Sequence, residues 1–182
     1  MWTALGLLQA CAFAWAVSPG PAGAERPPLT KNVPVWEFQN QGQDSGYDFN
    51  APPRGMFLRI QFAESFDQEL GPRQTYDFVP INPTTEFRTD SKAVFVVFGV
   101  HEHYASFQVN GRCYPEEVEG LAPTELVAED AAELHLEDNS GYLRFFPPPG
   151  GWKPGRYKVE IHVGYAVTGY SLVGTMRFTV VA

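Results

Sequence analysis

Two histidines separated by one residue, in His101-Glu102-His103, form the part of this sequence that comes nearest to a metal site. On an extended segment, side chains two residues apart point in the same direction. The two imidazoles can therefore ligate one zinc or copper ion, with Glu137 or Asp138 supplying an oxygen ligand. The simpler interpretation is a pair of exposed loop histidines, so metal binding at His101 and His103 is one hypothesis among several.

Familiar catalytic motifs are absent from the sequence. It contains no Gly-x-Ser-x-Gly, no His-Glu-x-x-His and no phosphate-binding glycine loop. A nucleophilic pair of Cys113 with a histidine is the remaining arrangement. However, Cys113 closely follows Asn110-Gly111, a strong hairpin signal, and we expect its side chain to pack inside the domain. We therefore predict a non-enzymatic protein without a cofactor.

The strands that must position any site are visible as period-two patterns. From Met56 onward apolar and polar residues alternate, and 93–98 is a continuous apolar run typical of a central strand covered on both faces. The acidic stretch 115–131 leaves room for a short helix. Strands are expected over 56–62, 76–79, 93–98, 104–109, from 112, 134–136, 142–146, 157–163 and 175–181. This pattern predicts an all-β sandwich or small barrel.

One segment among these predicted strands resembles a motif of a known family. Trp152-Lys153-Pro154-Gly155-Arg156-Tyr157 resembles the Leu-x-Pro-Gly-x-Tyr pattern that precedes strand F in fibronectin type III domains. The resemblance covers residues 84–182, about one hundred residues, the usual size of an immunoglobulin-like module. It implies an antiparallel immunoglobulin-like sandwich of about seven or eight strands. It also implies structural roles for Trp152, Pro154, Gly155 and Tyr157, the last with its hydroxyl bonded to upstream backbone.

The same resemblance assigns 93–99 to strand B, 104–109 to C, 157–163 to F and 175–181 to G. In that topology the B–C, D–E and F–G loops gather at one end. Here those loops are 100–104, 137–141 and 165–171, and they are rich in tyrosine and small polar residues, which suit recognition loops. Asp138-Asn139 can also serve a calcium ion, although an Asx turn explains these two residues more simply. The predicted binding residues are His101, His103, Tyr104, Asp138, Asn139, Tyr165 and Tyr170.

The first residues have the pattern of an export signal. Leu5 to Val17 is an apolar run broken only by Gln9, and Ala22-Gly23-Ala24 is a small-x-small cleavage site. We predict a signal peptide over 1–24 and an exported protein that is periplasmic, on the cell surface or extracellular. An uncleaved anchor and a lipoprotein acylated at Cys11 are the two alternatives.

The remainder divides into an arm and a domain. Residues 25–55 are Pro-rich and are expected to form an extended arm, whereas residues 56–182 form one β-sandwich. Within the arm, Val33-Pro34-Val35-Trp36-Glu37-Phe38 is apolar and is expected to form an edge strand or to lie on a neighbour. With the signal removed, Cys113 has no cysteine partner, so it is a buried residue, an intermolecular link or a reactive thiol.

The net charge of the chain bears on which kinds of molecule it can bind. The chain carries 21 Asp and Glu against 13 Lys and Arg, a net charge of −8. This balance argues against nucleic acid and against anionic lipid, both of which require cationic contacts. The leading hypothesis is an exported binding or accessory subunit that contacts a protein partner or another copy of itself through the clustered loops. The alternatives are a structural subunit that adds residues 33–38 as a strand to a neighbouring sheet, and the metal-binding module.

Overall fold

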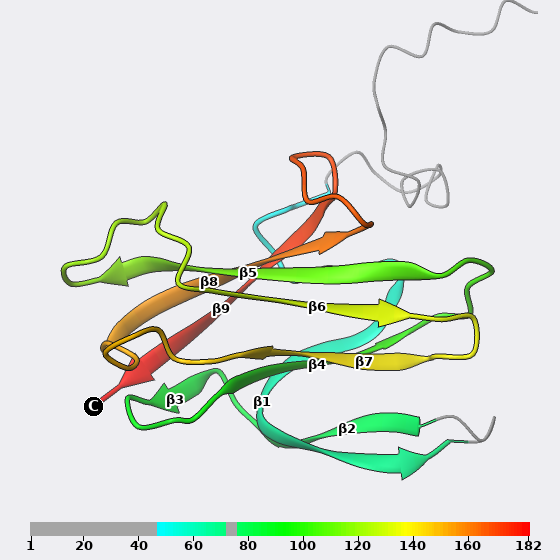
Figure 1. The fold of residues 1–182 in the computed structure, drawn as a ribbon, viewed down its shortest axis with the longest axis horizontal. Helices are drawn as coiled ribbons and strands as arrows, with labels where there is room; N and C mark the ends of the chain where they lie inside the picture. Colours follow the sequence, from blue (N-terminus) through cyan, green and yellow to red (C-terminus); the bar gives the residue numbers. More distant parts are fainter. Residues whose placement is uncertain (1–46, 72–75) are drawn as a thin grey trace, which may run out of the picture. The chain divides into compact units, whose positions relative to one another are not determined.

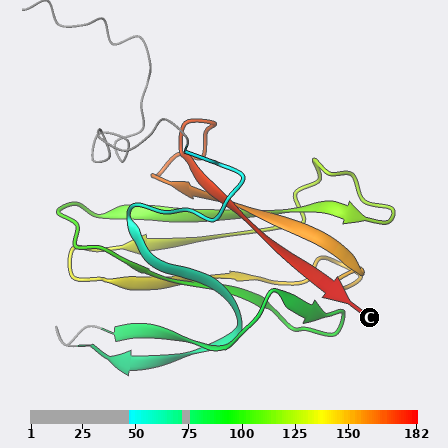
Figure 2. The same cartoon turned by 180° about the vertical axis from the view of Figure 1, so that it is seen from behind.

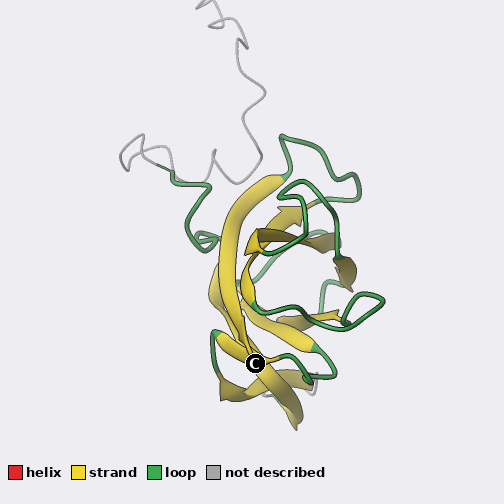
Figure 3. Ribbon diagram, turned by 90° about the vertical axis from the view of Figure 1, so that its left-hand side faces the viewer, coloured by secondary structure: helices red, strands yellow, loops and turns green. Residues whose placement is uncertain are grey.

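The computed structural model describes residues 47–71 and 76–182 of the chain. The predicted signal peptide (1–24), the alternative lipid anchor at Cys11 and the arm residues 25–46 lie outside the described residues. The described residues contain strands, turns and loops and no helix (Figure 3), so none of them forms a helix that could cross a membrane.

Nine strands form two sheets in the described residues, which confirms the predicted all-β sandwich (Figure 1). The four-stranded sheet has the order β2-β1-β4-β7 and the five-stranded sheet the order β3-β9-β8-β5-β6. Neighbouring strands are antiparallel except β3 and β9, which are parallel. The bounds are β1 Phe57–Leu70, β2 Tyr76–Pro83, β3 Glu86–Arg88, β4 Val94–Val100, β5 Phe107–Val118, β6 Ala128–Leu134, β7 Ser140–Phe145, β8 Gly155–Val163 and β9 Leu172–Val181.

The core lies between the two sheets and is made of alternate residues of their strands. At one end of it Tyr157 stacks on Phe178, with ring centroids 5.2 Å apart, and Trp152 packs edge-on against Tyr157 at 5.3 Å. The Tyr157 hydroxyl donates a hydrogen bond to the Lys153 carbonyl at 3.0 Å, the upstream backbone bond that the sequence pattern implied. Gly155 has a φ of 141°, and a β-carbon there would collide with the Glu117 carbonyl.

The β1–β2 hairpin folds over the outer faces of β4 and β7, its partners in the four-stranded sheet. Strand β1 pairs with β4 over Phe57–Ala63 and with β2 from Ala63 onward. Beyond this point Phe66 stacks on Tyr142 of β7, with ring centroids 4.1 Å apart, and packs against Phe95 of β4 at 5.4 Å. Strand β4 is therefore central and covered on both faces, as the apolar run 93–98 predicted, and the hairpin lies below β4 and β7 in Figure 1.

The hairpin predicted at Asn110-Gly111 is wrong, because β5 runs without interruption from Phe107 to Val118. A β-carbon at Gly111 would lie 2.6 Å from Phe145 Cζ and 2.7 Å from Leu143 Cδ1 of the opposite sheet. This glycine therefore permits a close approach between the sheets instead of a turn. The side-chain amide of Asn110 donates from Nδ2 to the Gly164 carbonyl at 2.8 Å.

Two further expectations differ from the structure. The segments around Leu134 and Tyr142 do not form a hairpin, because β6 belongs to the five-stranded sheet and β7 to the four-stranded one. The residues between them cross from one sheet to the other. The acidic stretch 115–131 forms no helix: it holds the end of β5, a turn and the start of β6, because both strands continue the pairing of the five-stranded sheet.

The described part of the predicted arm, residues 47–55, lies beside the start of β9 (Figure 2). The Tyr47 hydroxyl donates to the Val173 carbonyl, and the Thr175 amide donates to the Ala51 carbonyl at 2.9 Å. The guanidinium of Arg177 holds the same segment, because it donates a hydrogen bond to the Asn50 carbonyl at 2.6 Å. Residues 47–55 are thus bonded along the edge of β9 without forming a strand.

Gly111→Ala tests the close approach of the sheets. The added methyl must displace the buried Phe145 ring or Leu143, so we expect a loss of about 1–3 kcal/mol in the free energy of unfolding. Gly169→Ala is the matched control, because a β-carbon at Gly169 meets nothing within 4 Å, and its effect should stay within about 0.5 kcal/mol. Urea unfolding measures both variants, and equal stabilities would contradict the packing.

Candidate binding end

Three loops reach the same end of the two sheets. Loop 101–106 joins β4 to β5, loop 135–139 joins β6 to β7, and loop 164–171 joins β8 to β9. The register places them together, because Phe107 at the start of β5 pairs with Leu134 at the end of β6, and Val109 pairs with Val163 at the end of β8. Trp152 and Tyr157 lie where β8 begins, at the opposite end of that strand.

Loops 101–106 and 135–139 are bonded directly to each other. The His103 ring lies between two carbonyl oxygens, with Nδ1 3.0 Å from Ala105 O and Nε2 2.9 Å from Asp138 O. The Val100 amide donates to Asn139 O at 2.8 Å. His103, Asp138 and Asn139 were all predicted as binding residues, and the structure brings them together. Their contacts hold loop backbone in place.

The carboxylate of Asp138 is used within its own loop. Its Oδ2 accepts a hydrogen bond from the His135 amide at 2.8 Å, and the Asp138 amide donates to the His135 carbonyl at 3.0 Å. An aspartate side chain thus closes this turn, and such a turn was the simpler explanation of Asp138-Asn139 than a calcium site.

Metal ligation by His103 conflicts with these contacts. Both of its ring nitrogens face backbone carbonyl oxygens, so neither is open to an ion in this arrangement. Across residues 47–71 and 76–182, no group of three or more His, Cys, Asp or Glu side chains is placed to hold a metal. His101 is exposed, and its backbone amide donates to the Met56 carbonyl at 3.0 Å.

Loop 164–171 is tied to the five-stranded sheet. The Gly164 amide donates to the Gln108 carbonyl at 2.8 Å, and the Tyr165 hydroxyl reaches Glu133 of β6 at 3.4 Å. Tyr170 belongs to the same loop, where its amide donates to the Thr168 hydroxyl at 3.3 Å. Tyr165 therefore extends across β5 toward β6, whereas Tyr170 is placed by its own loop.

The tyrosines of this end are directed to solvent. Tyr104 is 92% exposed, Tyr165 64% and Tyr170 68%. None of the three is part of the core, although each carries a large apolar ring.

The β1–β2 hairpin also reaches this end, which the sequence did not indicate. The Phe78 amide donates to the Ser140 hydroxyl at 2.9 Å, and that hydroxyl lies 3.3 Å from the Tyr76 carbonyl. The start of β2 is thereby attached to the start of β7, next to loop 135–139. Leu70 and Tyr76, paired across the hairpin, are both exposed there. No pattern in the sequence indicated the sheet face beneath the hairpin.

Cys113 lies in the core and takes no part in this end. It is a free, fully buried thiol on β5, and burial raises its pKa. Because the thiolate is the reactive form, this environment favours the interpretation of Cys113 as a packed residue over a nucleophile.

His162 is a buried titratable residue that no pattern in the sequence singled out. It is buried on β8 under loop 164–171, with Nδ1 3.1 Å from the Ser171 hydroxyl. That hydroxyl donates its proton to the Thr168 carbonyl, so Nδ1 carries a hydrogen and donates to it. Among the described residues Nε2 has no hydrogen-bond partner and lies 3.9 Å from Glu160 Oε2. Burial lowers the pKa of His162, partly opposed by the Glu160 carboxylate.

Comparison with known proteins places the chain in no family. No protein-family model matches its sequence, and no curated protein matches it either.

The buried imidazole predicts a pH-dependent stability. Since the pKa of His162 is lower in the folded state than its ordinary value of 6.5, the unfolded chain takes up the proton first as the pH falls. The free energy of unfolding therefore falls as the pH drops below about 6.5. Above that pH, His162 causes no such loss. Urea unfolding of His162→Gln between pH 8 and 5 should show a smaller loss than the wild type.

His101→Gln is the matched control, because it removes an exposed histidine of the same end. It should retain the full pH dependence of the wild type. A His162→Gln variant that loses stability with pH as steeply as the wild type would contradict the role of the buried ring.

Proposed function

We propose that this protein is an exported, non-enzymatic binding or accessory subunit that contacts a protein partner through the loop end of its sandwich. The observation that carries the proposal is the group of three exposed tyrosines, Tyr104, Tyr165 and Tyr170, on loops that reach one end. Tyrosine supplies a large contact area at a low cost in conformational entropy, because it has only two side-chain torsions to fix.

The attachment of the loops supports this proposal. His103 of loop 101–106 and Val100 at the end of β4 both contact the backbone of loop 135–139. Gly164 and Tyr165 attach loop 164–171 to neighbouring strands. A surface that is held before binding loses less entropy when a partner arrives. The exposed rings thus sit on a largely preformed scaffold, which suits recognition.

We also propose that the sandwich is immunoglobulin-like and related to fibronectin type III domains. In support, β4 and β7 share one sheet while β5, β8 and β9 share the other, as strands B, E, C, F and G do in that fold. The Tyr157 hydroxyl bonds to backbone four residues upstream, as in a tyrosine corner. This assignment concerns the fold and adds nothing on the ligand.

Export is part of the proposal and rests on the sequence. The apolar run Leu5–Val17 and the small residues at 22–24 support a signal peptide and a periplasmic, cell-surface or extracellular location. The acidic balance supports a protein partner or a second copy in preference to nucleic acid.

Assembly by edge-to-edge strand pairing is less favoured than contact through the loops. A strand that recruits a neighbour needs free backbone groups along a sheet edge. Side chains occupy amides of three edge strands, β2, β3 and β7. The amide and oxygen pairs are Phe78 with Ser140, Arg88 with Ser91 and Arg144 with Asp130, at 2.9, 3.1 and 2.7 Å.

The proposal predicts that tyrosine substitutions weaken partner binding without unfolding the domain. Tyr104→Ala and Tyr170→Ala each remove an exposed ring, so thermal unfolding should be unchanged while affinity for the native partner falls about tenfold or more. The partner is recovered by crosslinking in the native host, and its affinity for each purified full-length variant is then measured by calorimetry.

Phe146→Ala is the matched control, because Phe146 is also an exposed aromatic residue (55%). It directly follows β7, at the opposite end of that strand from loop 135–139. It should bind as the wild type does. Tyrosine variants that unfold the domain, or that bind as tightly as Phe146→Ala, would contradict the proposed surface.

A further inference from the structure

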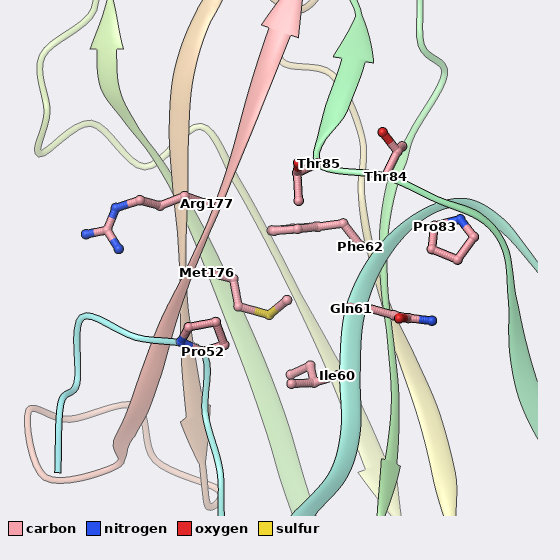
Figure 4. Close-up of a pocket in the computed structure, with 9 residues that line it drawn as sticks. All are labelled: Pro52, Ile60, Gln61, Phe62, Pro83, Thr84, Thr85, Met176 and Arg177. Carbon is pink, nitrogen blue, oxygen red and sulfur yellow. The ribbon is translucent and has the colours of Figure 1, made fainter.

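The sandwich is open along one side, between β1 of the four-stranded sheet and β9 of the five-stranded sheet. A groove of about 540 Å³ lies there, closed at one end by Pro52 and at the other by residues 83–85, which lead from β2 to β3 (Figure 4). Ile60, Phe62 and Met176 point into this space from the two strands. The remaining lining residues are Gln61, Thr84, Thr85 and Arg177.

On the β9 side of the groove, the backbone before Thr179 pairs with no strand among the described residues. The Thr175 amide donates outward to Ala51 O at 2.9 Å, and the Thr179 amide donates outward to Thr85 O at 2.8 Å. Because the direction alternates along a strand, the amide and carbonyl of Arg177, midway between them, face the same way. They face the groove between the segments of Ala51 and Thr85, which cover this edge of β9 on either side.

The β1 side repeats this arrangement. The Phe62 carbonyl accepts a bond from the Thr84 amide at 3.2 Å on the side away from β4. By the same alternation the backbone of Ile60, two residues earlier, faces the groove. The groove therefore combines an apolar floor with hydrogen-bonding backbone on both walls, which is what a short extended peptide requires.

Arg177 does not fill the groove with its side chain. Its Nε lies 3.1 Å from Glu116 on the outer face, and its guanidinium also donates to Asn50. Figure 4 shows the side chain directed away from Met176 and Ile60. The charge is thus held outside, and the floor of the groove stays apolar.

We propose that this groove binds Val33–Phe38 of the same molecule, with the Trp36 ring seated between Ile60, Phe62 and Met176. This segment is the apolar part of the arm, and an indole carries one N–H that the Gln61 or Thr84 side chain at the rim can accept. One backbone residue of the segment pairs with Arg177. The inference is independent of the loop end.

The length of the linking chain supports an intramolecular contact. The described chain begins at Tyr47, whose hydroxyl is bonded to Val173, four residues before Arg177 on β9. Those four residues span about 13 Å. Residues 39–46 can span about 26 Å when extended. The linking stretch is therefore long enough for residues 33–38 to reach the groove, and so short a tether corresponds to an effective concentration in the millimolar range.

Photo-crosslinking of the full chain tests the contact. With p-benzoylphenylalanine in place of Trp36, we expect crosslinks within the monomer to peptides that contain Ile60 or Met176. The same group at Gln43, in the linking stretch, should give little of this product. Crosslinked dimers would assign the groove to a second copy, and the absence of crosslinks to these peptides would remove the groove as the site. Either result overturns the proposal.

Hydrogen exchange supplies a second test that does not depend on the photoreactive group. In Trp36→Ala the amides of Ile60 and Arg177 should exchange about tenfold faster than in the wild type. Trp36→Phe should restore part of the protection. Equal exchange in the wild type and Trp36→Ala would refute the docking of the arm.

Discussion

The close packing of β5 against β7 at Gly111 is the constraint on which the rest of the arrangement depends. Because position 111 has no side chain, Phe145 and Leu143 fill the space between the sheets and β5 continues through this point as one strand. That continuous strand pairs with β6 on one side and β8 on the other. Its start therefore fixes the positions of all three loops of the binding end. A turn at Gly111 would separate them.

Side-chain hydrogen bonds hold the loops and strand edges that the core does not reach. Ser140 attaches the β1–β2 hairpin to β7, Asp130 of β6 occupies the Arg144 amide of β7, and His103 joins two loops through backbone carbonyls. Each bond satisfies a backbone group that would otherwise be open to water or to another chain. The loops and edges are thus held by hydrogen bonds, while the rings of Tyr104, Tyr165 and Tyr170 stay exposed to solvent.

Sequence reasoning was accurate where a local pattern reported a local environment. The alternation and the apolar run 93–98 predicted the sandwich and its central strand, and the motif ending in Tyr157 predicted the backbone bond of its hydroxyl. Prediction from the sequence failed where the environment of a residue is set by contacts with residues distant in the chain. Gly111 serves the opposite sheet, and His162 is buried by a loop that follows it in the chain. No local pattern distinguishes these glycine and histidine residues from turn and surface residues.

The central claim is that the loop end is where a protein partner binds. Hydrogen exchange of the full chain, alone and bound to its native partner, tests this claim most directly, because it reports every amide without altering a residue. Binding at the loop end should slow exchange in 100–105, 135–139 and 164–171 and leave exchange around 147–155, at the opposite end, unchanged. Protection confined to 147–155, or to the groove between β1 and β9, would contradict it.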